Sequence, residues 1–483
     1  MNIKFPETSE FIGGLYQPSR VEGSVLDLEV EGVIPDEICG TFYQVAPDHQ
    51  YPPMFEDDTF FNGDGMVKAF KFEKGRVNFT SKYVKTDRLK AQRKAGRSLN
   101  GRYRNVYTND PLAAKDNTTA NTNVLSFNGL LLAMKEDALP YIMDLETLET
   151  KEGQYNFNGQ IKSLTFTAHP KIDPESGNLL AFTYCAQGDG SKELAFFEIT
   201  PKGELLHEIW IEGPYVGMIH DFAITDNYIV LPYMPMTCDM ERVKAGGKYW
   251  EHQPTYDQLF AVFSRKGNGT DVRWFKGPKN NFPGHVLNSF EKDGLINVDI
   301  TGTNGNVFYF FPEESGFVPD PKSLKSTMQR WSFNFTAEDD YLEPIDLNQY
   351  PCEFPKCDDR FVGKEYTHGW MLSLDPRLPY NQNLGPFPFQ FMNQLTHLNV
   401  NSGVSDSWYA GDSQSFQEPI FVPKSPDAPE GEGYIIALMN NLDSKTTDVV
   451  ILDSLSMSNG PLATIHLPFR LRMSLHGSWA PAS

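Results

Sequence analysis

The sequence has few cysteines and no long apolar run. Its five cysteines are Cys39, Cys185, Cys238, Cys352 and Cys357. Their odd number and the absence of a Cys-x-x-Cys pair argue against a disulfide framework and against a thiolate metal site. No apolar stretch approaches the roughly 20 residues that cross a bilayer, and the first residues lack the charged and apolar regions of a signal peptide. We therefore expect a soluble, cytoplasmic protein without stable membrane association.

Positive charge is also in short supply. The chain has 42 Lys and Arg against 63 Asp and Glu, which gives a formal net charge of −21. This charge repels phosphate backbones, so we expect no nucleic-acid partner. It also disfavours binding to anionic membranes. A neutral or phenolic small molecule is compatible with it as a ligand, and a homodimer is compatible with the sequence.

Helical patterning is scarce, and short alternating apolar runs dominate. These runs have the length of a strand or a hairpin, and they cover residues 24–35, 66–84, 123–137, 192–213 and 448–456. Turn-forming residues separate them, and the chain contains 38 Gly and 34 Pro. The best helix candidates are residues 86–99 and 255–267.

No linker, low-complexity tract or charge block divides the chain, so we expect a single domain over residues 1–483. Many short strands without a break favour one large closed all-β fold, and a β-propeller closes its edges by radial repetition. Neither a WD nor a kelch signature is present, so the number of blades cannot be read from repeats. A sandwich combined with a barrel is the alternative architecture.

Four of the ten histidines share a setting, because each stands at the edge of an apolar strand beside a small or turn-forming residue. They are His169 in TFTAHPKID, His220 in GMIHDFAI, His285 in FPGHVLNSF and His476 in SLHGSW. Separations of 51, 65 and 191 residues exclude a common helix, so the four would have to converge from different strands. Four neutral imidazoles suit Fe, Cu or Zn better than Mg or Ca. Spacing alone favours a hydrogen-bonded core histidine at each position.

The other histidines carry weaker signals. Those at positions 49, 207, 252 and 466 lie in polar or turn-rich settings, where we expect ordinary surface or hydrogen-bonded side chains. His368 and His397 are not assigned.

A histidine that binds a metal needs its second ring nitrogen held, usually by a carboxylate. Three glutamates stand in apolar or Pro-flanked settings: Glu136 in LLAMKED, Glu353 in PCEFPK and Glu418 in SFQEPIFVP. Among 63 acidic residues the pattern alone does not select them.

Eight local strings, in order along the chain, resemble the carotenoid cleavage oxygenase superfamily, and within it the lignostilbene (stilbene-cleaving) dioxygenase branch. They are FFNGDGMVKAFKF (60–72), TANTNV (119–124), AMKED (133–137), AHPKIDP (168–174), MIHDF (218–222), QEP (417–419), SPDAPEGEGY (425–434) and LPFRLRMSLHGSW (467–479). The resemblance extends from about residue 12 to residue 479.

The resemblance implies a seven-bladed β-propeller with a loop and helical cap over an axial non-haem Fe(II), one per chain. The four strand-edge histidines would hold the iron, and Glu136, Glu353 and Glu418 would orient three of them. The stretch around Glu353 matches the family less tightly than the others do.

The stilbene-cleaving branch also implies residues for the substrate. Tyr103 in GRYRN and Lys135 in AMKED would bind its 4-hydroxyl group, and Phe61 would stack nearby. Thr122 in TANTN would lie close to a vacant iron position.

The expected reaction is cleavage of the central alkene of a 4-hydroxystilbene by O2 to give two aromatic aldehydes, without NAD(P), flavin or haem. The string NGDG lacks the spacing of a dinucleotide-binding loop, which agrees with this expectation. The main alternative is cleavage of 4-hydroxyphenylpropenoids such as isoeugenol or 4-vinylguaiacol, and carotenoid cleavage ranks third. From a different class, a Ca-dependent propeller hydrolase or lactonase would use carboxylate and carbonyl ligands.

Overall fold

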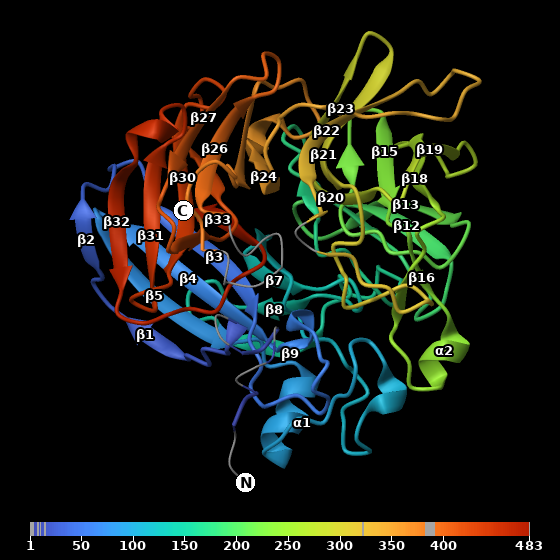
Figure 1. The fold of residues 1–483 in the computed structure, drawn as a ribbon, viewed down its shortest axis with the longest axis horizontal. Helices are drawn as coiled ribbons and strands as arrows, with labels where there is room; N and C mark the ends of the chain where they lie inside the picture. The colour runs from blue at the N-terminus through green and yellow to red at the C-terminus, as the bar shows by residue number, and fades with distance from the viewer. Residues whose placement is uncertain are drawn as a thin grey trace.

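Antiparallel sheets arranged around a central axis make up most of the computed structural model, which describes residues 4–6, 9, 11–13, 16–320, 323–381 and 392–482. Figure 1 shows the ring, with the blue N-terminal strands beside the red C-terminal ones. Seven sheets of four or more strands form the blades of a β-propeller, as predicted. An additional hairpin consists of β16 (Met236–Cys238) and β17 (Trp250–His252).

Strands up to residue 279 form the first four blades, except for β2 and the hairpin of β16 and β17, and β33 joins them from the end of the chain. Blade 1 contains β1 (Gly23–Val25), β3 (Gly40–Pro47), β4 (Gly65–Glu73), β5 (Arg76–Tyr83) and β33 (Gly477–Pro481). Blade 2 contains β6 (Asn123–Phe127), β7 (Leu130–Met134), β8 (Tyr141–Met143) and β9 (Thr150–Gln154). Blade 3 contains β10 (Lys171–Ile172), β11 (Leu179–Thr183), β12 (Glu193–Ile199) and β13 (Leu205–Glu212). Blade 4 contains β14 (Ala223–Ile224), β15 (Tyr228–Tyr233), β18 (Asp257–Ser264) and β19 (Arg273–Lys279).

The last three blades complete the ring. Blade 5 contains β20 (Phe282–Lys292), β21 (Leu295–Thr303), β22 (Ser326–Phe333) and β23 (Ile345–Asp346). Blade 6 contains β24 (Cys352–Cys357), β25 (His368–Ser373), β26 (Gln394–Asn399) and β27 (Ser405–Tyr409). Blade 7 contains β2 (Glu29–Gly32), β28 (Gln414–Phe416), β29 (Ile420–Pro423), β30 (Gly433–Asn441), β31 (Thr446–Asp453) and β32 (Pro461–Leu467).

Two strand exchanges close the ring. The C-terminal strand β33 pairs with β3 of the first blade, from Gln44 opposite Gly477 to Gly40 opposite Pro481. The N-terminal strand β2 pairs with β32 of the last blade. Residues 24–35 therefore do not form one strand or hairpin, because β1 and β2 join different blades on either side of Asp27, whose φ is +49°. The exchange joins the two ends of the chain, so the propeller has no open seam.

Short helices lie outside the sheets. The helix expected within residues 86–99 is α1 (Asp87–Ala95), which begins where the Thr86 side chain accepts a hydrogen bond from the Leu89 N–H. It ends at Gly96, whose φ of +68° is the left-handed conformation that glycine favours. Other short helices within the described residues include α2 (Met240–Lys244) and the 3₁₀ turns η2 (Phe60–Asn62), η3 (Val106–Thr108), η5 (Asp359–Phe361) and η7 (Met457–Asn459). No described helix is both long and apolar enough to cross a membrane.

The expectation of a helix over residues 255–267 is wrong. This segment contains β18, which pairs with β15 on one side and β19 on the other. Phe260, Ala261, Val262 and Phe263 are all buried, so both faces of the strand are covered. A short run that is apolar on both faces has no period of two, and its sequence does not distinguish a central strand from a buried helix.

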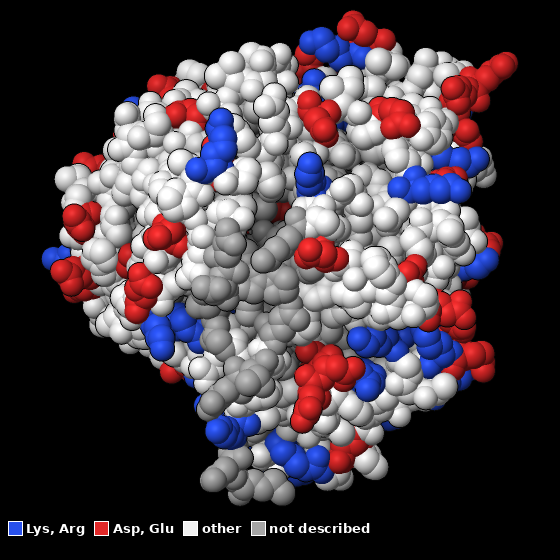
Figure 2. Space-filling model, in the orientation of Figure 1, with Lys and Arg blue, Asp and Glu red and all other residues white. Residues whose placement is uncertain are grey.

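Aromatic side chains fill the spaces between blades. Phe260 of blade 4 packs on Trp331 of blade 5, with ring centroids 4.7 Å apart, and Trp331 is 1 % exposed. Trp370 of blade 6 stacks on Phe421 of blade 7 at 4.6 Å. Figure 2 shows the face of the ring seen in Figure 1, and acidic and basic side chains are interspersed over it. The buried rings hold neighbouring blades in fixed positions, which fixes the inner strands that meet near the axis.

Candidate metal centre

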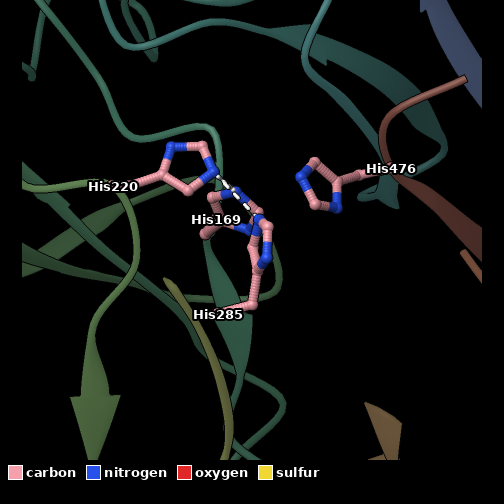
Figure 3. Close-up of side chains that lie close together, drawn as sticks. All are labelled: His169, His220, His285 and His476. Carbon is pink, nitrogen blue, oxygen red and sulfur yellow. Dashed lines mark hydrogen bonds between the residues drawn. The ribbon is translucent and has the colours of Figure 1, made fainter. Parts of the chain in front are cut away.

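The structure brings the four strand-edge histidines together near the axis (Figure 3). His285 lies in β20, whereas His169, His220 and His476 stand just before β10, β14 and β33, so four different blades contribute one histidine each. One ring nitrogen from each lies within 4.8 Å of the corresponding nitrogen of the other three. Nε2 of His220 is 3.1 Å from Nε2 of His169 and 3.0 Å from Nε2 of His285.

Three glutamates hold the outer nitrogens of three of these rings. Nδ1 of His220 donates to Oε1 of Glu136 at 2.5 Å. Nδ1 of His285 donates to Oε2 of Glu353 at 2.6 Å. Nδ1 of His476 donates to Oε1 of Glu418 at 2.8 Å. The three glutamates are therefore those singled out in the sequence, and the Glu353 contact is as close as the other two.

This hydrogen bonding makes the cluster suitable for a cation. Each carboxylate accepts a hydrogen bond from Nδ1–H, so the neutral form of the His220 or His285 ring carries its lone pair at Nε2. These two lone pairs face each other across 3.0 Å, which is repulsive unless a cation lies between them. Burial lowers the pKa of His476 to about 4, although Glu418 opposes this shift. At His285 burial is outweighed by the Glu353 carboxylate, and the pKa is raised. The cluster offers imidazole nitrogens, which fit iron or another first-row metal better than Ca²⁺, because Ca²⁺ takes oxygen ligands.

The environment of Glu353 shows how closely the carboxylates are fixed. Its Oε1 accepts a hydrogen bond from the Thr301 hydroxyl at 2.6 Å, and its Oε2 accepts one from the N–H of Phe354 at 2.6 Å. Burial would raise the pKa of Glu353, but His285 and these donors lower it below its ordinary value. Gly284 leaves room for this arrangement, because a Cβ at that position would lie 2.2 Å from both Oε1 of Glu353 and Oγ1 of Thr301.

A largely apolar cavity opens from one side of the histidines. Its volume is about 1100 Å³ including the open mouth, and His220, His285 and His476 form part of its wall. Its remaining lining is mostly aromatic and sulfur-containing side chains from segments outside the inner strands: Phe11, Tyr16, Phe60, Phe61, Met218, Met234, Val307, Phe308, Phe310, Phe311, Met473 and Leu475.

The residues predicted to bind substrate also lie in this cavity wall. Lys135 follows β7 and Tyr103 follows α1, and the Lys135 Nζ lies 4.7 Å from the centroid of the Tyr103 ring. The Lys135 Nζ donates to Oγ1 of Thr119 at 2.9 Å and lies 3.4 Å from Oδ2 of Asp137. Burial lowers the pKa of Lys135, and the Asp137 carboxylate opposes this shift. A lysine that is 4 % exposed thus faces an apolar cavity, with one carboxylate favouring its charged form.

Phe61 and Thr122 lie close to these groups. The Phe61 carbonyl is 3.4 Å from Nζ of Lys135, and its ring is 5.9 Å from that of Phe308. The Thr122 carbonyl accepts a hydrogen bond from the N–H of His476 at 3.2 Å. Thr122 therefore joins the cavity wall to the histidine cluster.

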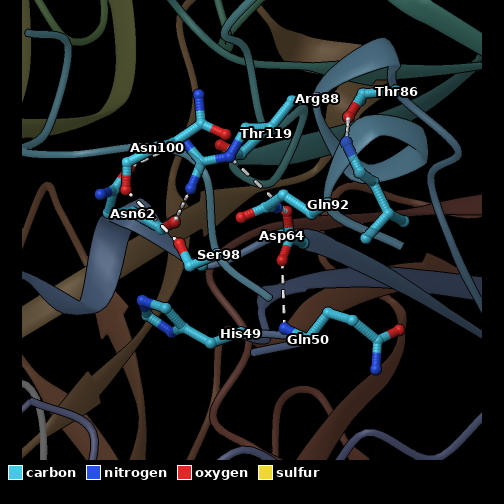
Figure 4. A network of polar contacts seen from close by, with 12 residues as sticks. His49, Gln50, Asn62, Asp64, Thr86, Arg88, Gln92, Ser98, Asn100 and Thr119 are labelled. Atoms are coloured by element: carbon cyan, nitrogen blue, oxygen red, sulfur yellow. Dashed lines mark hydrogen bonds and ion pairs between the residues drawn. The ribbon is translucent and has the colours of Figure 1, made fainter. Parts of the chain in front are cut away.

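A polar network that the sequence analysis did not identify supports this wall (Figure 4). Arg88 of α1 donates to the side-chain and backbone oxygens of Asn62 in η2 at 3.0 and 2.8 Å. Asp64 accepts from Gln92 of α1 at 3.0 Å. The network fixes η2, and with it Phe61, against the helix. No local motif marks it, because its members are far apart in sequence.

The aromatic segment at residues 307–311 was also not predicted from the sequence to line the site. The string VFYFF places four aromatic residues in succession after β21, and Phe308, Phe310 and Phe311 of this string line the cavity. Four successive aromatic residues in a loop between two strands are unusual, and this pattern could have indicated the cavity wall in the sequence.

Comparisons with known proteins agree with this geometry. The family described as RPE65, retinal pigment epithelial membrane protein, matches residues 16–481. The crystal structure of Pseudomonas brassicacearum lignostilbene dioxygenase superposes with a TM-score of 0.97 at 57 % identity, covering 100 % of both chains. Lignostilbene-alpha,beta-dioxygenase isozyme III of Sphingomonas paucimobilis is 44 % identical over 99 % of this chain and 98 % of its own.

Two further relatives carry different substrate names. Resveratrol cleavage oxygenase 1 of Aspergillus fumigatus is 43 % identical over 99 % of this chain and 97 % of its own. Isoeugenol monooxygenase of Pseudomonas nitroreducens is 40 % identical over 97 % of both chains. The family match spans most of the chain, and the chain belongs to the RPE65/carotenoid cleavage oxygenase family.

Proposed function

We propose that this protein is a non-haem Fe(II) dioxygenase that cleaves the central alkene of 4-hydroxystilbenes with O2 to give two aromatic aldehydes. One iron per chain would be held by His169, His220, His285 and His476. The observation that carries the proposal is a single apolar cavity that has the histidine cluster in its wall and a buried lysine beside a tyrosine. Similarity to lignostilbene and resveratrol oxygenases supports the choice of substrate.

When bound, the iron would supply the activation of O2 beside the alkene. The chain itself acts on the phenol. The Lys135 ammonium and the Tyr103 hydroxyl stabilise a phenolate at the 4-position of the substrate, and the low dielectric of the cavity strengthens both contacts. The negative charge of the phenolate is delocalised to the alkene and makes it more reactive toward oxygen. Glu136, Glu353 and Glu418 keep the imidazoles in the tautomer that binds metal.

The carboxylates provide a first prediction. Glu353→Gln is expected to weaken iron binding by about 10- to 100-fold, because the neutral amide no longer fixes His285 with a charge. The amide oxygen can still accept the hydrogen bond from His285, and the NH2 group can donate to the Thr301 hydroxyl, which can rotate to accept, so the fold should be retained. Iron titration of metal-free protein measures the effect. Glu365→Gln, at an exposed partner of Lys292, is the matched control. Equal affinity in Glu353→Gln and wild type would contradict the role of Glu353.

The aromatic wall provides a second prediction, which concerns the size of the substrate. Phe308→Ala is expected to lower kcat/KM for a stilbene by about tenfold, since the loss of one aromatic contact corresponds to roughly 1.4 kcal/mol. Isoeugenol has no second ring and should lose much less. Phe317→Ala is the control, because Phe317 follows in the same loop but is 62 % exposed. Equal losses for both substrates would mean that Phe308 does not contact a second ring.

The second candidate function is cleavage of 4-hydroxyphenylpropenoids. It is favoured by the similarity to isoeugenol monooxygenase and by the fact that Lys135 and Tyr103 would bind the phenol of either substrate. Aerobic assays of the Fe(II)-loaded protein with resveratrol, isoeugenol and 4-vinylguaiacol separate the two. Two aldehydes from resveratrol with poor turnover of the propenoids would support stilbene cleavage. Vanillin from the propenoids with resveratrol unchanged would overturn it.

The single-domain organisation over residues 1–483, a cytoplasmic location and a homodimer stay predictions. A Ca-dependent hydrolase is not supported, since the site that the structure assembles presents nitrogen ligands.

A further inference from the structure

A second cavity adjoins the histidine cluster, and its walls are polar. It has a volume of about 1000 Å³ including its opening, and its lining comes from the inner strands of the blades. These include β6, β10, β20, β24, β29 and β33, which contribute residues such as Leu125, Ile172, Leu287, Cys357 and Ser478. We call this cavity the axial channel. His169 lines the axial channel and not the substrate cavity, whereas His285 lines both.

Three chain segments pass from one cavity to the other, and each changes its lining role at the histidine site. Residues 282–284 line the substrate cavity, and residues 286–287 line the axial channel. Residues 353–354 line the substrate cavity, and residues 355–357 line the axial channel. Residues 473 and 475 line the substrate cavity, and residues 477–479 line the axial channel. The histidine cluster therefore separates two cavities of different character.

Two ion pairs and a further carboxylate line the axial channel. Lys171 lies 3.1 Å from Oδ1 of Asp221, and Lys356 lies 3.2 Å from Oε1 of Glu418. Asp359, at the start of η5, is exposed and also lines the channel. Three carboxylates and two ammonium groups leave a net charge of −1 along this wall. The wall offers carboxylate oxygens to a passing cation.

The substrate cavity offers no such route. A hydrated divalent cation that enters a passage lined by phenylalanine and methionine loses hydration without replacement, at a cost of several kcal/mol or more. A bound stilbene would also fill that passage. We propose that Fe(II) reaches and leaves the four-histidine site as a hydrated ion through the axial channel, while the organic substrate uses the apolar cavity. This inference rests on the proposed function.

The test is the rate at which loaded enzyme loses iron to an excess of a large, sulfonated chelator in the absence of O2. Asp359→Trp fills the channel at an exposed position, and we expect iron loss and iron uptake to slow by the same factor, about tenfold or more. If iron loss and iron uptake slow by the same factor, the equilibrium affinity for iron is unchanged. A distorted metal site would instead change this affinity. Asp359→Lys should slow both rates less, with a larger effect at low ionic strength, where charge is less screened. Asp36→Lys, an exposed position outside the channel, makes the same charge change as control.

A second measurement needs no variant. The saturated analogue 4-hydroxybibenzyl, which has no alkene to cleave, should occupy the apolar cavity of the wild type and leave the rate of iron loss within about twofold. Slowing by the analogue together with wild-type rates in both Asp359 variants would overturn the channel. Iron content and stilbene turnover of the wild type are measured first. If the wild type neither binds iron nor cleaves stilbene, the proposed function is overturned. If it does both, and the Asp359 variants lose and take up iron at wild-type rates, only the channel is overturned.

Discussion

Lys135→Met is expected to lower kcat/KM for a 4-hydroxystilbene by about 10²- to 10³-fold, with iron content unchanged. This is the effect of removing one donor that stabilises charge developing in a transition state. Lys135 suits the role because it is 4 % exposed and faces the apolar cavity, where a charge-assisted hydrogen bond is stronger than in water. Methionine keeps most of the side-chain volume. Position 135 lies outside the histidine cluster, so iron binding should persist.

Two comparisons make this prediction specific. Tyr103→Phe and the double variant complete a double-mutant cycle, and the two losses should not be additive if both groups bind the same oxygen. A stilbene with 4-methoxy in place of 4-hydroxy should be a poor substrate for the wild type and should lose little further in Lys135→Met. Retention of most turnover of the 4-hydroxystilbene, with normal iron, would show that Lys135 does not stabilise a phenolate.

The local pattern of the chain predicted much of the fold. Apolar runs and the turn signals between them identified the hairpins β4–β5, β6–β7 and β12–β13. The outer strands β5 and β13 alternate because each has one more exposed face. The pattern failed at β18, where both faces are covered. It failed again at residues 24–35, because the exchange of β2 into blade 7 depends on contacts with residues 463–466, which no local window contains.

The site was accessible to sequence reasoning in a different way. Spacing showed that the four histidines could meet only in space, and the family resemblance selected them and the three glutamates that the structure places beside three of them. The apolar lining of the cavity was not accessible. Its members Phe11, Met218, Phe308 and Met473 come from segments far apart in sequence, and single apolar residues do not show which cavity they face.

His220→Ala is expected to lose iron and activity together. The substitution removes one of the four proposed ligands and also leaves the Glu136 carboxylate, 2.5 Å from Nδ1 in the native protein, without its imidazole. Loss of an outer partner alone costs about 10- to 100-fold in metal affinity, so loss of the ligand itself should reduce stilbene turnover to about a hundredth of the wild-type rate or less. Metal analysis of protein purified after loading with Fe(II) measures the first effect, and aldehyde production measures the second.

His466→Ala is the matched control for this variant. Its imidazole is bonded to Asp448 at 3.0 Å in blade 7, and its side chain is 37 % exposed. We expect wild-type iron content and turnover in this variant. Iron at the wild-type level in His220→Ala would remove His220 from the ligand set. Loss of iron in both variants would instead indicate a folding defect, which thermal unfolding of the metal-free proteins would reveal. In that state His220→Ala should still unfold cooperatively, but a few degrees below the wild type, because the buried Glu136 carboxylate loses the hydrogen bond from Nδ1 of His220.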